Sequence, residues 1–256
     1  MRQSFLQNGA QKYNGERSSL SGWFGTPQGA YVLGWELAQF DSAVDDVFGF
    51  RAVQVGLPEV DFLRQNRIQF RISVAIEPGA TVAADPLQLP LESQSVDLLA
   101  LPHVLEFHPN PHEVLREAER VLMPEGQVVI SGFNTASLWR LRQLVPFMDK
   151  SGCPWDAHFI GLLRLRDWLR VLGFELNGGK FGVYAPPFRQ QNWLDRFAFM
   201  DKAGARWWPL LGGLYVVRAV KRVHGMRLIT PAWRMERARR RSLAPVTHRT
   251  QKNHER

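Results

Sequence analysis

Cysteine is nearly absent from this sequence of 256 residues, which contains only Cys153. A single thiol excludes an intramolecular disulfide and a zinc site built from several cysteines. The lack of disulfides is consistent with a reducing compartment. Hydrophobic residues make up 45% of the chain and charged residues 22%. A chain of this length and composition can bury a sizeable core without covalent cross-links.

Long apolar runs are also absent. The best candidate for a membrane span, Trp207 to Val220, contains Arg218 and is shorter than the roughly 20 residues that a spanning helix needs. The first residues lack the apolar core that is typical of a signal peptide. We therefore predict a cytoplasmic protein without a membrane span.

Positive charge is concentrated at one end of the chain. Residues 221–256 contain 11 Lys and Arg but only 2 Asp and Glu, a formal charge of +9, whereas the whole chain carries +8. Residues 1–220 are therefore close to neutral. We predict that 221–256 is a disordered basic tail, which either keeps the protein soluble or makes a weak contact with nucleic acid, anionic lipid or an acidic partner.

Short apolar runs alternate with helical patterns from Phe50 onward, which is typical of an α/β layered sheet. We predict a flexible N-terminus over 1–22, a domain over 23–220 that begins with a helix-rich segment, and the tail. Strands are expected at 51–56, 72–76, 81–85, 95–101, 127–131, 174–176, 183–185 and 214–220, and helices at 60–66, 111–122 and 159–172. The helix from Pro111 is the most clearly marked, because Asn110 precedes it and proline is favoured at the first helical position.

The stretch from Asp85 to Asn134 resembles the class I S-adenosylmethionine-dependent methyltransferases, specifically the small-molecule, quinone-biosynthesis-like type. The residues that carry the resemblance are Asp85-Pro86-Leu87-Gln88-Leu89-Pro90, Ser95-Val96-Asp97, His103-Val104-Leu105, and Arg116 through Gly126 (REAERVLMPEG). The resemblance implies a Rossmann-like fold with a mostly parallel central sheet and flanking helices. It also implies S-adenosylmethionine as cofactor and a small-molecule methyl acceptor.

The cofactor would lie at the carboxyl ends of the strands, where open α/β sheets bind their ligands. There Gly56 allows the backbone to approach the ligand, Glu77 can accept the ribose hydroxyls, and Asp85 can accept the adenine amino group. Pro86, Leu101 and Pro102 are the neighbouring candidates for the cofactor site. His103 is the candidate catalytic base, since it could remove a proton from an acceptor hydroxyl; the alternative is a packed histidine.

The cofactor half departs from the family in two places. The family's first-strand pattern, D-x-G-x-G-x-G, here reads Gln54 to Val60, with Gly56 as its only glycine and Pro58 in place of the second. Moreover, only three residues separate Glu77 from Thr81, whereas a parallel crossover needs a dozen or more. We therefore expect that these two strands form a hairpin or that one of them is not a strand. These departures leave a second hypothesis open, a non-catalytic methyltransferase-like binding or scaffold module.

Several further residues have two interpretations. His108 and His112 lack a recognised ligand spacing, so we predict no metal. Glu117 and Arg120 form either an ion pair on one helix face or, with Arg116, a clamp for an acidic substrate. The tryptophans at 193, 207 and 208 either cover a flat apolar acceptor or pack in the core.

Overall fold

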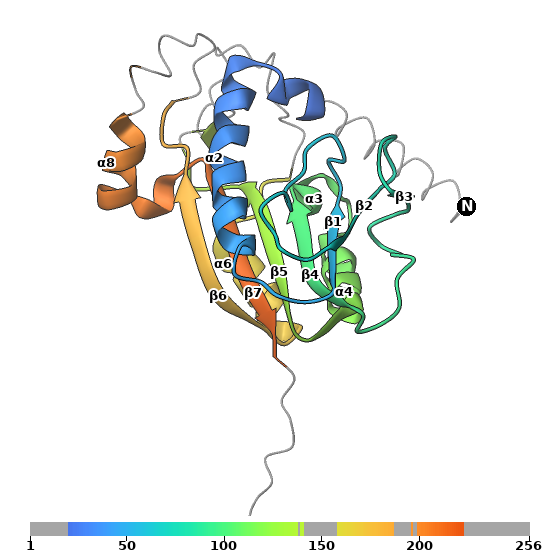
Figure 1. Cartoon of the computed structure of the whole chain (residues 1–256). Coiled ribbons are helices and arrows are strands. Elements are labelled where there is room, and N and C mark those ends of the chain that lie inside the picture. Colours follow the sequence, from blue (N-terminus) through green and yellow to red (C-terminus); the bar gives the residue numbers. More distant parts are fainter. Residues whose placement is uncertain (1–19, 138, 141–157, 187–195, 197–198, 223–256) are drawn as a thin grey trace, which may run out of the picture. The chain divides into compact units, whose positions relative to one another are not determined.

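The computed structural model describes residues 20–137, 139–140, 158–186, 196 and 199–222. Seven strands form one sheet in the order β3-β2-β1-β4-β5-β7-β6 (Figure 1). The strands β1 to β5 are parallel to one another, and β7 runs antiparallel to both β5 and β6. The predicted mostly parallel α/β fold is therefore confirmed. The strands are β1 (Arg51–Val55), β2 (Phe70–Ala75), β3 (Val82–Ala83), β4 (Val96–Pro102), β5 (Leu122–Phe133), β6 (Phe174–Gly182) and β7 (Leu214–Lys221).

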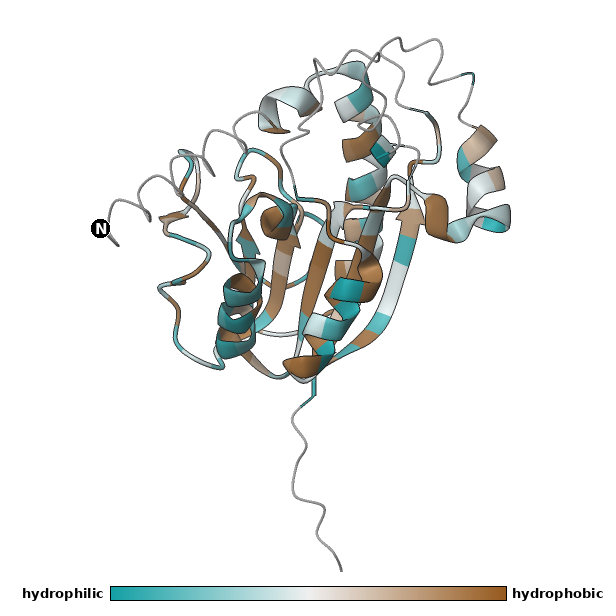
Figure 2. Cartoon of the chain, turned by 180° about the vertical axis from the view of Figure 1, so that it is seen from behind, coloured by the Kyte–Doolittle hydropathy of each residue, from teal (hydrophilic) through white to brown (hydrophobic). Residues whose placement is uncertain are grey.

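Helices cover both faces of the sheet. Helix α2 (Pro27–Val44) crosses one face, and α4 (Pro111–Val121) and α6 (Leu162–Val171) cover the other (Figure 1). Figure 2 shows the apolar strands in brown behind the polar outer surfaces of α4 and α6. A short helix α3 (Val104–Phe107) follows β4, and α8 (Phe199–Trp207) with the 3-10 turn η1 (Pro209–Leu211) precedes β7.

Local signals explain where α2 and α4 begin. Helix α4 starts at Pro111 as predicted, and its buried residues Val114, Leu115, Ala118 and Val121 share one face. Helix α2 starts after Thr26, whose Oγ1 accepts the Gly29 backbone N–H at 3.1 Å. This hydrogen bond satisfies one of the donors that a helix N-terminus leaves unpaired.

The segment between β1 and β2 contains turns, so the helix predicted over 60–66 is wrong. In this segment the side-chain amides of two buried residues bond to backbone groups, in place of the hydrogen bonds that a helix would make. Asn66 Nδ2 donates to the carbonyls of Val44 and Val47, and Gln54 bonds to the first part of the segment. Side-chain bonds from neighbouring elements therefore fix this connection.

The connection between β2 and β3 also differs from the prediction. The two segments pair in parallel, with Val74 opposite Val82. They therefore form no hairpin, and both are strands, so both expected alternatives are wrong. No crossover helix is required, because β3 has only two residues and starts beside the end of β2. The segment that links the end of β2 to the start of β3 therefore spans only a short distance. Ser73 Oγ accepts the Thr81 N–H at 2.9 Å and fixes this segment against β2.

Near the end of the chain, the two strand segments predicted at 174–176 and 183–185 are also corrected. A single strand, β6, runs from Phe174 to Gly182, and residues 183–185 lie outside it. The antiparallel partner β7 supports it along its whole length, with Phe174 opposite Lys221 and Gly182 opposite Leu214.

Candidate functional site

The sequence-predicted cofactor residues follow the carboxyl ends of adjacent parallel strands. Gly56 comes directly after β1, Glu77 lies two residues after β2, Asp85 two residues after β3, and Pro102 ends β4. Because β3, β2, β1 and β4 are neighbours in that order, these residues gather at one edge of the sheet. Gly56 adopts a positive φ of 82°, which glycine tolerates without steric cost.

The two acids of this edge have different surroundings. Both carboxylate oxygens of Glu77 are buried, although the residue as a whole is partly exposed. Asp85 Oδ1 accepts the Leu87 N–H at 2.8 Å and lies 3.7 Å from His108 Nε2. The interaction with the neighbouring His108 imidazole lowers the pKa of Asp85, so this carboxyl is ionised near neutral pH. Pro86 and Leu101, the neighbouring candidates, are buried.

The loop after β1 is held by Gln54, the residue that stands where the family has an acid. Its Nε2 lies within hydrogen-bond distance of the carbonyl oxygens of Gly56, Leu57 and Val60, at 2.8 to 3.1 Å. Its Oε1 accepts the Phe62 N–H at 2.9 Å. A carboxylate cannot donate to carbonyls. This loop conformation therefore requires an amide side chain at position 54, because an acid there could not donate the hydrogen bonds.

A buried charged cluster lies beside the end of β4. His103 is fully buried, and its Nδ1 lies 2.6 Å from Glu106 Oε2 while its Nε2 lies 3.3 Å from Glu36 Oε2. The second oxygen of Glu106 accepts the Phe133 N–H. The three groups come from α2, the end of β4 and α3, so the cluster ties α2 to the sheet. His103 has a φ of 51°, a strained conformation for a non-glycine residue, which these ring contacts hold in place.

The charges around His103 determine its protonation. Burial alone would lower its pKa, but Glu36 and Glu106 outweigh burial and raise the pKa of His103 to about 10. Burial raises the pKa of Glu106 and also that of Tyr215, which faces Glu106. The imidazole therefore carries its proton at neutral pH. A histidine in this state is not poised to accept a proton, so the surroundings favour the packed alternative over the predicted base.

Sequence reasoning missed Glu36, although its position gives a signal. The buried face of α2 repeats every four residues as Val32, Glu36, Phe40 and Val44. A carboxylate within an apolar stripe must find a partner, because burying an unpaired charge is costly. The partner, His103, is 67 positions away along the chain, a separation that helical periodicity does not reveal.

The remaining predictions have mixed outcomes. Glu117 and Arg120 form the expected ion pair at 2.7 Å, and Arg120 also donates to the carbonyls of Leu89 and Leu91, so it anchors a loop. Trp207 and Trp208 are 71% and 57% exposed, so core packing is wrong for both. Trp193 lies outside the described residues. Over the described part of the chain, no group of three or more His, Cys, Asp and Glu residues is arranged to hold a metal ion.

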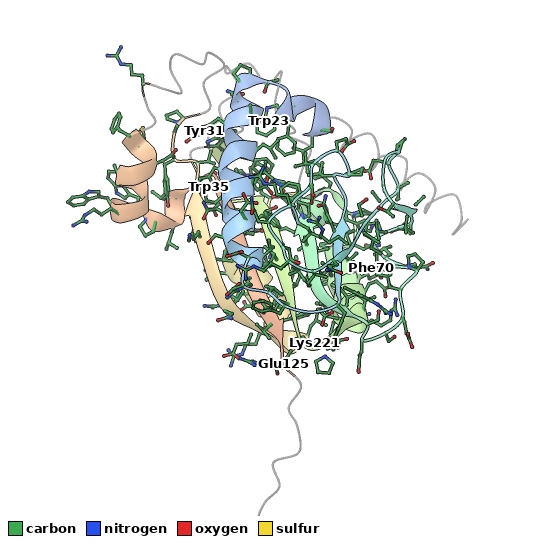
Figure 3. All side chains as sticks on the ribbon, in the orientation of Figure 1. Trp23, Tyr31, Trp35, Phe70, Glu125 and Lys221 are labelled. Atoms are coloured by element: carbon green, nitrogen blue, oxygen red, sulfur yellow. The ribbon has the colours of Figure 1, made fainter. Side chains whose placement is uncertain are left out.

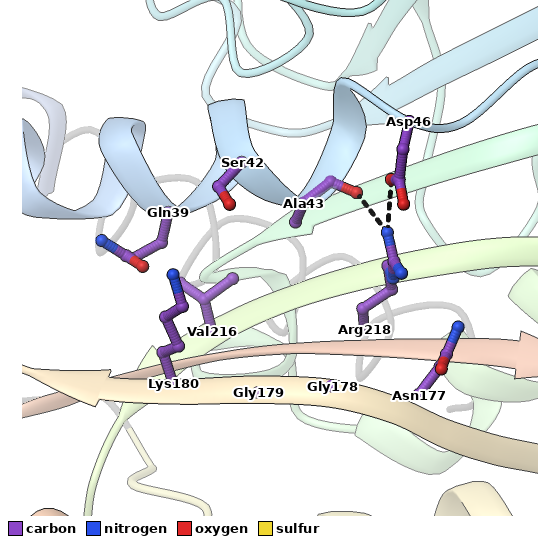
Figure 4. A pocket seen from close by; sticks show the side chains of 10 residues that line it. All are labelled: Gln39, Ser42, Ala43, Asp46, Asn177, Gly178, Gly179, Lys180, Val216 and Arg218. Carbon is purple, nitrogen blue, oxygen red and sulfur yellow. Dashed lines mark hydrogen bonds and ion pairs between the residues drawn. The ribbon is translucent and has the colours of Figure 1, made fainter.

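The described residues also line cavities that do not include the predicted cofactor residues. One, of about 220 Å³, lies between α2 and the β6–β7 ladder, where Arg218 contacts Ala43 O and Asp46 and Lys180 extends into the opening (Figure 4). Another, of about 250 Å³, lies beside the Gln54-held loop and the face of β2. Neither cavity is lined by Glu77, Asp85 or His103.

Comparison with known proteins identifies similar chains. Residues 59–130, from the loop after β1 into β5, match the methyltransferase domain family. The chain is 37% identical over 140 residues to the uncharacterized protein YafS of Escherichia coli, covering 54% of this chain and 58% of YafS. It is 24% identical over 133 residues to the uncharacterized protein MJ1123 of Methanocaldococcus jannaschii, covering 49% of this chain and 64% of MJ1123. The matched region thus spans less than two thirds of either relative.

Solved structures share the fold. An S-adenosylmethionine-dependent methyltransferase from Thermotoga maritima aligns with a TM-score of 0.53 and 20% identity, covering 78% of this chain and 93% of that one. A chain of the complex between the Trm112 methyltransferase activator and a methyltransferase of Haloferax volcanii aligns with a TM-score of 0.57 and 14% identity, covering 82% and 98%. At these identities the likeness shows the fold. No helix among the described residues is both long and apolar enough to cross a bilayer.

Proposed function

We propose that this chain is a class I S-adenosylmethionine-dependent methyltransferase that transfers a methyl group to a small-molecule acceptor. The match of residues 59–130 to the methyltransferase domain family and the shared fold support the proposal. The observation that carries the proposal is the gathering of Gly56, Glu77 and Asp85 at the carboxyl ends of β1, β2 and β3. In open α/β sheets this edge is where ligands bind.

The residues present fit the nucleoside part of the cofactor. The buried carboxylate of Glu77 can accept two ribose hydroxyls, and the ionised Asp85 can accept the adenine amino group. Pro86, Leu101 and Pro102 would supply apolar contacts, and Gly56 would allow close backbone approach. When bound, S-adenosylmethionine supplies an electrophilic methyl group.

The chain itself would contribute orientation and the exclusion of water. Aligning two reactants can supply several kcal/mol of the barrier, on the order of 7. The role of His103 as a proton acceptor stays a prediction, and its two carboxylate partners favour a role in fixing the backbone after β4. The tail's contact with nucleic acid or an acidic partner also stays a prediction, as does a cytoplasmic location.

The second candidate is a non-catalytic binding or scaffold module, and the loop after β1 favours it. Gln54 turns three loop carbonyls toward itself, and Leu57 is buried with a φ of 47°. This arrangement differs from a glycine-rich loop that could wrap the amino acid end of the cofactor. The two candidates differ in whether the cofactor binds at all.

Titration calorimetry with S-adenosylmethionine and S-adenosylhomocysteine tests the proposal. We expect binding of both, and a weakening of about tenfold or more in Glu77→Gln, since a hydrogen bond to a charged group contributes about 1.5–3 kcal/mol. Glu92→Gln, the same change at an exposed position, should leave the affinity unchanged. Absence of binding by the folded protein would reject the enzyme and leave the scaffold module.

A further inference from the structure

An exposed apolar surface is built by the end of α8 and by η1. Its members Trp207, Trp208, Leu210 and Leu211 are 71%, 57%, 64% and 45% exposed. We call these four residues the Trp207 patch. They lie within five consecutive positions, whereas exposed single apolar side chains are normally scattered over a protein surface. Helix α8 lies beyond the edge strand β6 (Figure 1).

Helix α8 is attached to the domain through polar and small residues. Asp201 accepts hydrogen bonds from the Tyr31 hydroxyl and from the Tyr184 N–H, and Tyr31 extends from α2 on the side of α8 (Figure 3). One turn later, a Cβ added to Gly204 would lie 2.3 Å from the Tyr184 ring. The helix thus turns its acid inward and its tryptophan outward, the reverse of an ordinary surface helix.

Backbone hydrogen bonds hold the patch in this orientation. The Tyr184 hydroxyl donates to Pro209 O at 2.8 Å, and Asn134 Nδ2 donates to Leu210 O at 2.7 Å. The Trp208 N–H donates to Gly204 O at 2.9 Å. The main chain of the turn is therefore fixed by hydrogen bonds while its apolar side chains remain exposed. The fold itself thus holds these side chains at the surface.

We propose that the Trp207 patch docks the protein onto an anionic lipid surface. Tryptophan is favoured at the boundary between water and hydrocarbon, and the neighbouring Arg206 is exposed and cationic. The acid of α8, Asp201, is engaged by Tyr31 and Tyr184, so the exposed charge beside the patch is that of Arg206, and an anionic surface is the complementary partner.

A second copy of the chain fits this surface less well. The four partly exposed side chains offer on the order of 500 Å², below the about 800 Å² per partner of a standard protein interface. A lipid surface has no such requirement, because affinity there scales with the apolar area inserted plus the attraction to anionic headgroups.

Co-sedimentation of the full chain with vesicles tests the proposal. We expect binding to vesicles of phosphatidylcholine and phosphatidylglycerol, and a loss of about tenfold or more in partitioning for the double variant Trp207→Ser/Trp208→Ser. Phe70→Ser is the control, since Phe70 is 55% exposed at the start of β2, toward the edge of the sheet that lies far from β6 and α8 (Figure 3). Its partitioning should equal that of the unaltered protein.

Salt separates the patch from the basic tail. Attraction between the tail and the headgroups is screened at high salt, whereas inserted apolar side chains remain bound. Binding that persists at high salt and depends on the two tryptophans supports the proposal. Absence of vesicle binding, or equal binding by the double variant, overturns it. A dimer in solution that the double variant dissociates, without vesicle binding, assigns the patch to a second copy instead.

Discussion

The two halves of the sheet share one hydrogen-bonded framework but are built by different means. From β4 to β5, the chain follows a regular path in which α4 covers the strands with a continuous apolar face. From β1 to β3, the trimmed half, loops replace the crossover helices, and the amides of Gln54 and Asn66 supply the hydrogen bonds. A parallel sheet therefore does not need a helix at each crossover when buried side chains satisfy the loop backbone.

The two halves also contribute differently to the fold and to the proposed cofactor site. The regular half provides the core, whereas three of the four strands that would hold a cofactor lie in the trimmed half. Retaining the fold therefore does not require retaining the cofactor. Variants in each half should consequently have different effects, and the strongest effect on stability is expected at the buried cluster beside the end of β4.

Replacing His103 should have the largest effect on stability. His103→Gln removes the cation between Glu36 and Glu106 and leaves two buried carboxylates facing each other. We expect a loss of about 3–5 kcal/mol in the free energy of unfolding, measured by urea denaturation. His112→Gln, which loses mainly a ring contact with Trp168, is the control and should cost far less. Equal losses in the two variants would contradict the charged cluster.

The same cluster predicts a dependence of stability on pH. The folded pKa of His103, about 10, exceeds its ordinary value of 6.5, so the folded state binds this proton more tightly than the unfolded state. The contribution is complete below about pH 6.5 and is lost as pH rises toward 10. Between about pH 6.5 and 9.5 the unfolding free energy should fall by on the order of 3 kcal/mol. His103→Gln should lack this decline, and an unchanged decline would assign it to other groups.

Changing Gln54 tests the trimmed half. Gln54→Glu replaces a donor by a carboxylate that faces the carbonyl oxygens of Gly56, Leu57 and Val60. We expect a loss of about 1–3 kcal/mol in the free energy of unfolding, because buried acceptors lose their donor. Gln88→Glu, the same change on the surface, should be close to neutral. A stable Gln54→Glu protein would show that the loop can adopt the acid-bearing conformation of the family.

The sequence predicts the regular half well and the trimmed half poorly, for physical reasons. The spacing of Val114, Leu115 and Ala118 along the sequence predicts helix α4, because helical periodicity depends only on residues that are close in the chain. The parallel pairing of Val74 with Val82 escaped prediction, because the length rule for crossovers assumes strands of ordinary length. The residues of the candidate site also differ in how well the sequence predicts them. Residues that follow strand ends can be found from the sequence, whereas Glu36 requires the packing of α2 against His103.

The proposed function depends on one property, which is that the edge beside Gly56 and Glu77 binds an adenosyl cofactor although Gln54 organises the adjoining loop. Titration calorimetry of the unaltered chain with S-adenosylhomocysteine is the decisive experiment, because this compound is the demethylated product of the cofactor and its binding requires no methyl acceptor. We predict saturable binding with one site per chain that Glu77→Gln weakens by about tenfold or more. A folded chain that releases no heat at millimolar ligand, with equilibrium dialysis also showing no binding, would mean that this edge holds no cofactor.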